Sequence, residues 1–249
     1  NKQTVLVFMP WTGNGNDDQG LYHTFQQNLD SIERAIVANR GYAGRLVVFV
    51  STSAQASQMY EVTCQRGVLA HIPLKTYTGH SYTTAEGIAQ ILNDVKDHAF
   101  ALNYAMIVGG HGCGWTRIAD WDDYPTCAKR APLPVGGEAS AYPQTRFFGS
   151  VTANAYAIDV ATLAEGIRQA GVKLQYLLFD NCYMANVETA YALRQATNWL
   201  VASTSEIMAM GMPYAAMWRY LGSATPSYGN MVSTFHTFYE ASPTPSGAL

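Results

Sequence analysis

"TVLVFMP" occupies residues 4–10, and this heptapeptide decides the fold class. It is rich in residues that favour β-structure, and it is almost continuously apolar. A strand with one exposed face alternates apolar and polar residues, whereas a strand buried on both faces does not. The stretch therefore predicts a central strand of a parallel sheet that is covered on both sides.

Segments with helical and strand character alternate along the rest of the chain. Apolar residues recur at helical spacing after the first strand, and Thr83 with Glu86 forms the pattern of a capping box. Further strands are expected at 45–51, 104–112, 174–179 and 199–204, and helices at 25–38, 83–98, 159–170, 186–197, 214–221 and 231–240. Such alternation predicts an α/β fold in three layers, with a mostly parallel central sheet between helices. We expect one domain over residues 1–249, interrupted by a long loop at about 113–151.

The composition limits the classes of partner. Only 13% of the 249 residues are charged and the formal net charge is −3, with no cluster of Lys and Arg that would favour nucleic acid. No apolar run approaches the roughly 20 residues that a membrane span needs. The chain begins with Asn1 rather than Met, so we expect a mature or trimmed form, and the lack of a leader says little about its compartment. The four cysteines form no C-x-x-C pair, which disfavours a zinc ribbon or a redox motif.

Two strand ends carry candidate catalytic groups. His111 follows one predicted strand and Cys182 follows another, and ligands of open α/β sheets bind at the carboxyl ends of strands. A thiol beside an imidazole provides the minimum parts of nucleophilic catalysis, provided that the thiol pKa is lowered by an imidazolium or a helix N-terminus. The N–H groups of Gly112 and Cys182 are candidates for an oxyanion hole. The competing interpretation is a small buried cysteine and a structural histidine.

The two motifs together resemble the clostripain family of cysteine peptidases, which is related to gingipain and legumain. "IVGGHGCGW" at 107–115 matches the family pattern H-G-x-G-W after a strand, and "LLFDNCYMANVETAYALR" at 177–194 matches D-x-C-x-M-x-x-x-E. The resemblance covers roughly residues 4–221 and implies a caspase-like domain. It also implies a secreted or surface-associated endopeptidase with a His111–Cys182 dyad that acts on peptide or protein substrates.

The resemblance further implies cleavage after Arg or Lys, with Asp180 as the anion of the S1 pocket. In an extended segment, residues two apart point to the same side, so Asp180 can lie near the scissile bond and bind a guanidinium with both oxygens. The alternative is that Asp180 caps the following helix or orients its loop. Cys113 is a second thiol near His111, but it lies too close in sequence to face His111 across a cleft. A catalytically inactive binding module, or a thiol hydrolase of non-peptide amides or esters, are the rival functions.

Two further expectations concern the loops. Lys129 and Arg130 lie together in the long loop, and family members often cut their own linker after a basic residue, so this pair is a candidate self-processing site. The remaining histidines form no cluster with carboxylates, so no metal or other cofactor is expected. Calcium dependence occurs among relatives, and loop aspartates supply oxygen atoms for it, although none fits an EF-hand. These aspartates are Asp17, Asp18, Asp120, Asp122 and Asp123.

Overall fold

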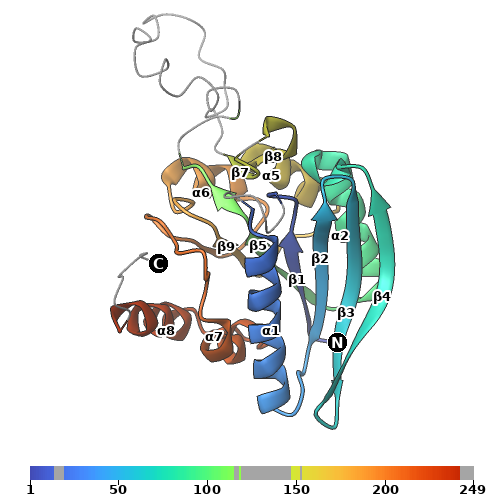
Figure 1. Cartoon of the computed structure of the whole chain (residues 1–249), viewed down its shortest axis with the longest axis vertical. Helices are drawn as coiled ribbons and strands as arrows, with labels where there is room; N and C mark the ends of the chain where they lie inside the picture. Colours follow the sequence, from blue (N-terminus) through green and yellow to red (C-terminus); the bar gives the residue numbers. More distant parts are fainter. Residues whose placement is uncertain (14–19, 115–117, 119–146, 152, 242–249) are drawn as a thin grey trace, which may run out of the picture.

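A seven-stranded sheet forms the centre of the computed structural model, which describes residues 1–13, 20–114, 118, 147–151 and 153–241. The strand order is β10-β9-β5-β1-β2-β3-β4 (Figure 1). Five strands run parallel: β1 (Gln3–Met9), β2 (Arg45–Ser53), β5 (Asn103–Gly109), β9 (Leu177–Asp180) and β10 (Leu200–Val201). The antiparallel strands β3 (Ala56–Gln65) and β4 (Val68–Thr78) extend one edge.

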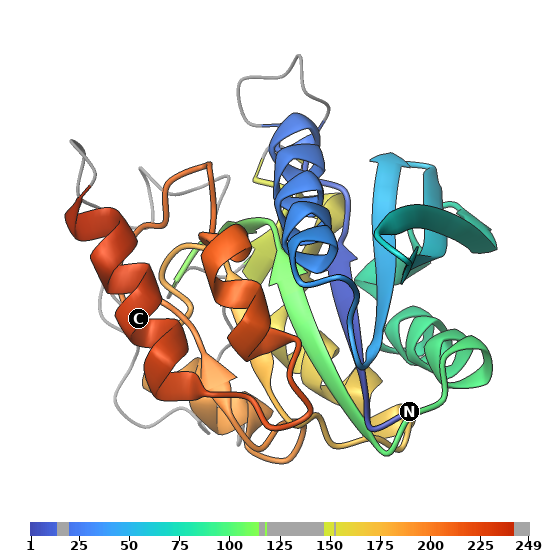
Figure 2. The same cartoon turned by 90° about the horizontal axis from the view of Figure 1, so that it is seen from below.

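Helices cover both faces of this sheet, as the sequence predicts. Helices α1 (Tyr22–Ala38), α7 (Tyr214–Leu221) and α8 (Tyr228–Glu240) lie on one face, and α2 (Ala85–His98) and α5 (Val160–Gln169) lie on the other (Figures 1 and 2). The short helix α6 (Val187–Leu193) joins the second layer through Leu193. None of the helices that the structure describes combines the length and the apolar character that crossing a bilayer requires.

Strand β1 shows why a continuous apolar run marks the centre of the sheet. Leu6 and Phe8 point into the core beneath α2 and α5, whereas Val5 and Val7 point into the core beneath α1 and α7. All four side chains are at most 1% exposed. Burial of a large apolar side chain contributes about 1.5 to 3 kcal/mol, so this strand stabilises both layers at once.

A second, smaller sheet stands beside the carboxyl end of β5. It consists of β6 (His111–Gly112), β7 (Phe147–Gly149) and β8 (Ala157–Asp159), paired antiparallel in the order β6-β7-β8. The predicted strand at 104–112 is therefore two strands that belong to different sheets. Phe148 anchors the small sheet to the main core, where its ring packs edge-on against Phe179 at 5.5 Å.

The β3–β4 hairpin was not expected from the apolar pattern. Its two-residue turn consists of Arg66 and Gly67, both with positive φ, between the paired residues Gln65 and Val68. Turns of this kind match the natural twist of a hairpin. Strand β4 is mostly exposed, so it lacks the apolar periodicity by which buried strands are recognised.

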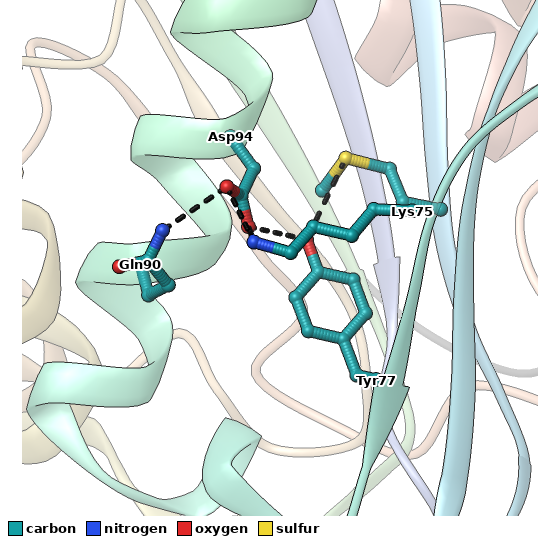
Figure 3. A network of polar contacts seen from close by, with 5 residues as sticks. Lys75, Tyr77, Gln90 and Asp94 are labelled. Atoms are coloured by element: carbon teal, nitrogen blue, oxygen red, sulfur yellow. Dashed lines mark hydrogen bonds and ion pairs between the residues drawn. The ribbon is translucent and has the colours of Figure 1, made fainter.

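A buried carboxylate joins this hairpin to helix α2 (Figure 3). Asp94 accepts hydrogen bonds from Lys75 Nζ at 2.8 Å, from the Tyr77 hydroxyl at 2.7 Å and from Gln90 Nε2 at 3.0 Å. The Tyr77 hydroxyl also lies 3.8 Å from the sulfur of Met59. A charge that is 6% exposed is tolerated here because it is paired and fully hydrogen-bonded.

Helices α1 and α8 each begin three residues earlier than predicted, and the boundaries of α2 and α6 differ as well. The N-cap of α2 is Thr84, whose hydroxyl accepts a hydrogen bond from the Gly87 N–H at 3.1 Å, rather than Thr83. Helix α6 ends at Leu193 rather than near Thr197, although its start after Asn186 is as predicted. Thr197 instead forms a parallel β-bridge with Leu174. Helical spacing alone had placed Thr197 in the helix.

The contact between α2 and α5 depends on Gly166. A Cβ at this position would stand 2.7 Å from Ile88 Cβ and 2.9 Å from the carbonyl oxygen of Ala85. We expect Gly166→Ala to lower the free energy of unfolding by about 2 kcal/mol, because the helices must separate to admit the methyl group. Gly229→Ala is the matched control, since a Cβ there meets nothing within 4 Å. That variant should keep or slightly raise stability in urea unfolding, and equal losses in both would contradict the packing argument.

Candidate active site

The carboxyl ends of β5 and β9 bring the candidate residues together. Gly109 pairs with Asp180 in the last register of the two strands, so the segments that follow them leave the sheet side by side. Asn181 Nδ2 donates a hydrogen bond to the carbonyl oxygen of His111 at 3.2 Å and fixes one segment on the other. His111 and Cys182 line one hollow at this end of the sheet.

The walls of this hollow come from four parts of the chain. The first turns of α1 form one wall, the segments after β5 and β9 form two more, and the segment after β10 closes the fourth. The lining residues are Leu21, Thr24, Phe25, Asn28, Gly110, His111, Asp180, Asn181, Cys182, Ile207, Met208, Ala209 and Gly211. Three of the sequence-predicted site residues, His111, Asp180 and Cys182, are thus in one place.

Gly112 packs directly against the backbone of the cysteine. A Cβ at Gly112 would stand 2.1 Å from the carbonyl oxygen and 2.9 Å from the nitrogen of Cys182, so only glycine fits. The Cys113 N–H bonds to the Phe147 carbonyl at 3.2 Å, and hydrogen-bonded pairs alternate along an antiparallel ladder. The N–H of Gly112 therefore points away from β7.

The turn that carries Cys182 is held in an uncommon conformation. Tyr183 has a φ of 59°, in the left-handed region that few residues other than glycine adopt. Its N–H donates to the Ser205 carbonyl at 3.0 Å, and the N–H of Ala185 donates to the Ser203 carbonyl at 2.8 Å. Backbone outliers of this kind concentrate at functional sites, where the surrounding structure holds them in place.

The Cys182 thiol is bound to the segment after β10. Its Sγ lies 3.4 Å from the carbonyl oxygen of Ile207, to which it donates, and 3.3 Å from the Ile207 nitrogen, from which it accepts. Burial raises the pKa of this thiol, and the negative charges of Glu206 and Asp180 raise it further, against the lowering effect of the Ile207 N–H. The pKa of the thiol is thus raised in this arrangement rather than lowered, because Cys182 is partly buried and lies near two carboxylates.

Asp180 is buried at the hollow, and only one of its two carboxylate oxygens accepts hydrogen bonds from described residues. Its Oδ2 accepts hydrogen bonds from the Tyr214 hydroxyl at 2.8 Å and from the Met212 N–H at 3.3 Å. Its Oδ1 has no hydrogen-bond partner among the residues that the structure describes. Burial raises the pKa of Asp180 to about 6, while the bonds from Tyr214 and Met212 act in the opposite direction.

Comparison with known proteins agrees with this geometry. The model of the clostripain family matches residues 136–244. A secreted C11 cysteine protease from Bacteroides thetaiotaomicron, called iotapain, is 36% identical over 99% of this chain with a TM-score of 0.83. The chain is thus similar to the clostripain family, in the matched segment and in its fold. It spans 64% of the length of that solved protease.

Two more distant structures share the fold of this chain. An inactive zymogen C11 protease from Parabacteroides distasonis is 22% identical with a TM-score of 0.74, over 96% of this chain and 59% of its own. A second secreted C11 cysteine protease from Bacteroides thetaiotaomicron is 17% identical with a TM-score of 0.69, over 96% of this chain and 59% of its own. No match was found among curated proteins.

The second thiol near His111 differs from Cys182 in its surroundings. Cys113 is not among the described residues that line the hollow. Burial, with a smaller effect of Cys182, raises the pKa of Cys113 to about 12. Of these two thiols, Cys182 is the one that lines the hollow.

Sequence analysis missed the contribution of helix α1 to the site. Thr24 and Asn28 line the hollow one turn apart, and Asn28 is 6% exposed. A signal was present, because Asn28 is a polar residue within the apolar stripe formed by Phe25, Leu29 and Ile32. A polar side chain in such a stripe is either paired or placed in a site.

The other predicted loop features lie outside the described residues. These are the Lys129–Arg130 pair and the loop aspartates Asp17, Asp18, Asp120, Asp122 and Asp123. Within the described part of the chain, no group of three or more His, Cys, Asp and Glu residues is arranged to hold a metal ion.

The charge of Glu206 gives a test of the thiol environment. Because Glu206 raises the pKa of Cys182, Glu206→Gln should shift the pH dependence of Cys182 alkylation by iodoacetamide to lower pH. Mass mapping of the labelled peptide separates Cys182 from the other cysteines. Glu240→Gln, on the exposed face of α8, is the control and should leave the profile in place. A profile that is unchanged in Glu206→Gln would contradict the assigned cause.

Proposed function

We propose that the chain is a cysteine endopeptidase that hydrolyses peptide bonds after a basic residue. One observation carries the proposal: His111 and Cys182 line a single hollow, into which a buried carboxylate also faces. The similarity to a protein described as a secreted C11 cysteine protease supports it. Export from the cell is part of the same proposal. Because the chain spans 64% of that relative, the activity of the whole protein is included in what we propose.

Each group would have one role in the reaction. The imidazole of His111 takes the Sγ proton, and the thiolate of Cys182 attacks the carbonyl carbon while the carbonyl π electrons move onto oxygen. The N–H groups of Gly112 and Cys182 stabilise that oxyanion. His111 then protonates the amine nitrogen as the C–N bond breaks, which leaves a thioester. Water, deprotonated by His111, hydrolyses the thioester and restores the thiol. None of these steps needs a metal or another cofactor, and calcium dependence stays a prediction.

Asp180 would bind the cationic side chain before the scissile bond, as the S1 anion. The unpartnered Oδ1 is a buried acceptor in a hollow, and a bound cation would satisfy it. The same cation would help the nucleophile, because the charge of Asp180 is among those that raise the pKa of Cys182. A positive charge against that carboxylate offsets its effect on the thiol.

The nucleophile assignment is tested with a fluorogenic peptide amide that ends in a basic residue. Cys182→Ala and His111→Ala should each lower kcat/KM by roughly a thousandfold or more, because the dyad acts as a unit. Cys113→Ala is the matched control and should keep most of the activity. If only Cys113→Ala lost activity, the nucleophile would be Cys113 and not Cys182.

The rival functions have different outcomes in the same assay. A folded, reduced protein that releases no amide would be a binding module. Cleavage of esters but of no peptide would identify a thiol hydrolase of other substrates. Self-processing after Lys129 or Arg130 stays a prediction.

The role of Asp180 gives a pH dependence with a defined sign. Below the pKa of about 6 the carboxyl is protonated and uncharged, so kcat/KM for a basic peptide should fall as the pH drops through this value. Asp180→Asn should remove most cleavage after basic residues while iodoacetamide still labels Cys182. Equal losses of both would favour the structural role of orienting the loop.

The free energy of unfolding should respond to pH in the opposite direction to the activity, because it should rise as the pH falls. Burial raises the pKa of Asp180 from 3.8 to about 6, so the folded protein binds this proton more tightly than the unfolded chain does. The ionised group therefore costs stability above pH 6, and this cost disappears as the pH falls towards 4. Asp180→Asn should raise the free energy of unfolding by about 3 kcal/mol at pH 8 and by little at pH 4. A destabilised Asp180→Asn at pH 8 would contradict this.

A further inference from the structure

The available atoms of the S1 carboxylate limit which cation it can bind. Oδ2 of Asp180 already accepts hydrogen bonds from Tyr214 and Met212, which leaves Oδ1 as its one unpartnered oxygen within the described chain. A guanidinium binds a carboxylate best as a fork, with two parallel N–H groups on two oxygens. The bidentate contact expected from the sequence is therefore not available here.

The Asn28 carboxamide lies next to this carboxylate. Its Nδ2 and the Asp180 Oδ2 stand 2.8 and 2.5 Å, respectively, from the point that a Cβ of Gly211 would occupy. Gly211 has a φ of 70° and carries no side chain, so it lets the two polar groups approach the same wall of the hollow. Its carbonyl oxygen is held by the Tyr239 hydroxyl at 2.5 Å, which fixes this wall in place.

An ammonium group fits these acceptors better than a guanidinium does. A lysine side chain carries three N–H donors at one point, and they can be divided between the oxygens of Asp180, Asn28 and Thr24, three residues that line the hollow. A half turn of the Asn28 amide presents either its oxygen or its nitrogen. An arginine would place five N–H donors against the same few acceptors, and a donor that is buried without a partner is costly.

We propose that Asn28 is a specificity-determining residue of this site, and that together with the single available oxygen of Asp180 it selects lysine over arginine before the scissile bond. The inference rests on the proposed function. The proposed function covers both lysine and arginine before the scissile bond. The inference names lysine and assigns the selection to Asn28 on α1.

The test compares two fluorogenic peptides that differ only in lysine or arginine before the cleaved bond. With the unmodified chain, kcat/KM should favour lysine by about tenfold, as expected for one unpaired buried donor. Asn28→Leu keeps the size of the side chain without its acceptor. It should lower kcat/KM for the lysine peptide about tenfold more than for the arginine peptide.

Tyr214→Phe provides an independent second variant. It removes one of the two donors to Oδ2, so that oxygen can accept a hydrogen bond from a guanidinium, and the ratio should shift towards arginine by about threefold or more. A variant that only perturbed packing would lower both rates together. If Asn28→Leu does not fold, this measurement still tests the part of the inference that concerns the single available oxygen of Asp180.

The outcomes separate this inference from the function on which it rests. Cleavage of both peptides with equal or greater rates for arginine would overturn the inference and leave the peptidase intact. Equal losses for both peptides in Asn28→Leu would overturn the role of Asn28. If neither peptide is cleaved by a folded protein whose Cys182 still reacts with iodoacetamide, the proposed function fails, and the inference fails with it.

Discussion

The parallel pairing of β5 with β9 is the constraint on which the site depends. Its register runs from Met106 opposite Leu177 to Gly109 opposite Asp180, so both strands end at the same level. The chain then carries His111 out of one strand and Cys182 out of the other, and Asn181 bonds to the His111 carbonyl across 70 residues of sequence. A shift of two residues would carry Cys182 about 6 to 7 Å along the strand, out of reach of the imidazole.

The sequence predicts those features whose cause is local. The apolar run around Leu6 requires burial on both faces, and the polar residues that follow Phe179 mark a strand end, so the three-layer fold and the candidate dyad could both be inferred. The β3–β4 hairpin could not, because its outer strand is exposed and the turn at Arg66 depends on backbone conformation rather than on composition. The place of Asn28 in the hollow could not be predicted, because only tertiary packing brings Asp180 to α1.

The candidate site contains Asp180 although the ionised carboxyl lowers the stability of the folded protein. An ionised carboxyl with one unpartnered buried oxygen is unfavourable in the folded protein, which its raised pKa expresses. Tyr214 and Met212 reduce that cost by bonding Oδ2, but in doing so they leave one oxygen for a ligand. The same two hydrogen bonds therefore lower the cost of the buried charge. They also leave Oδ1 as the carboxylate oxygen without a partner among the described residues.

The state of the thiol follows from the same carboxylates. In the described arrangement Cys182 is a neutral thiol that shares two contacts with the backbone of Ile207, and the charges of Asp180 and Glu206 oppose its ionisation. A thiolate forms readily only when one of these influences is offset. If Asp180 binds the cation of a substrate as proposed, that cation offsets one of them when a peptide is bound, in addition to the lowering effect of the Ile207 N–H. The proposed function therefore links the ionisation of Cys182 to occupation of the pocket beside it, because the charge of Asp180 acts on the thiol and would bind the substrate.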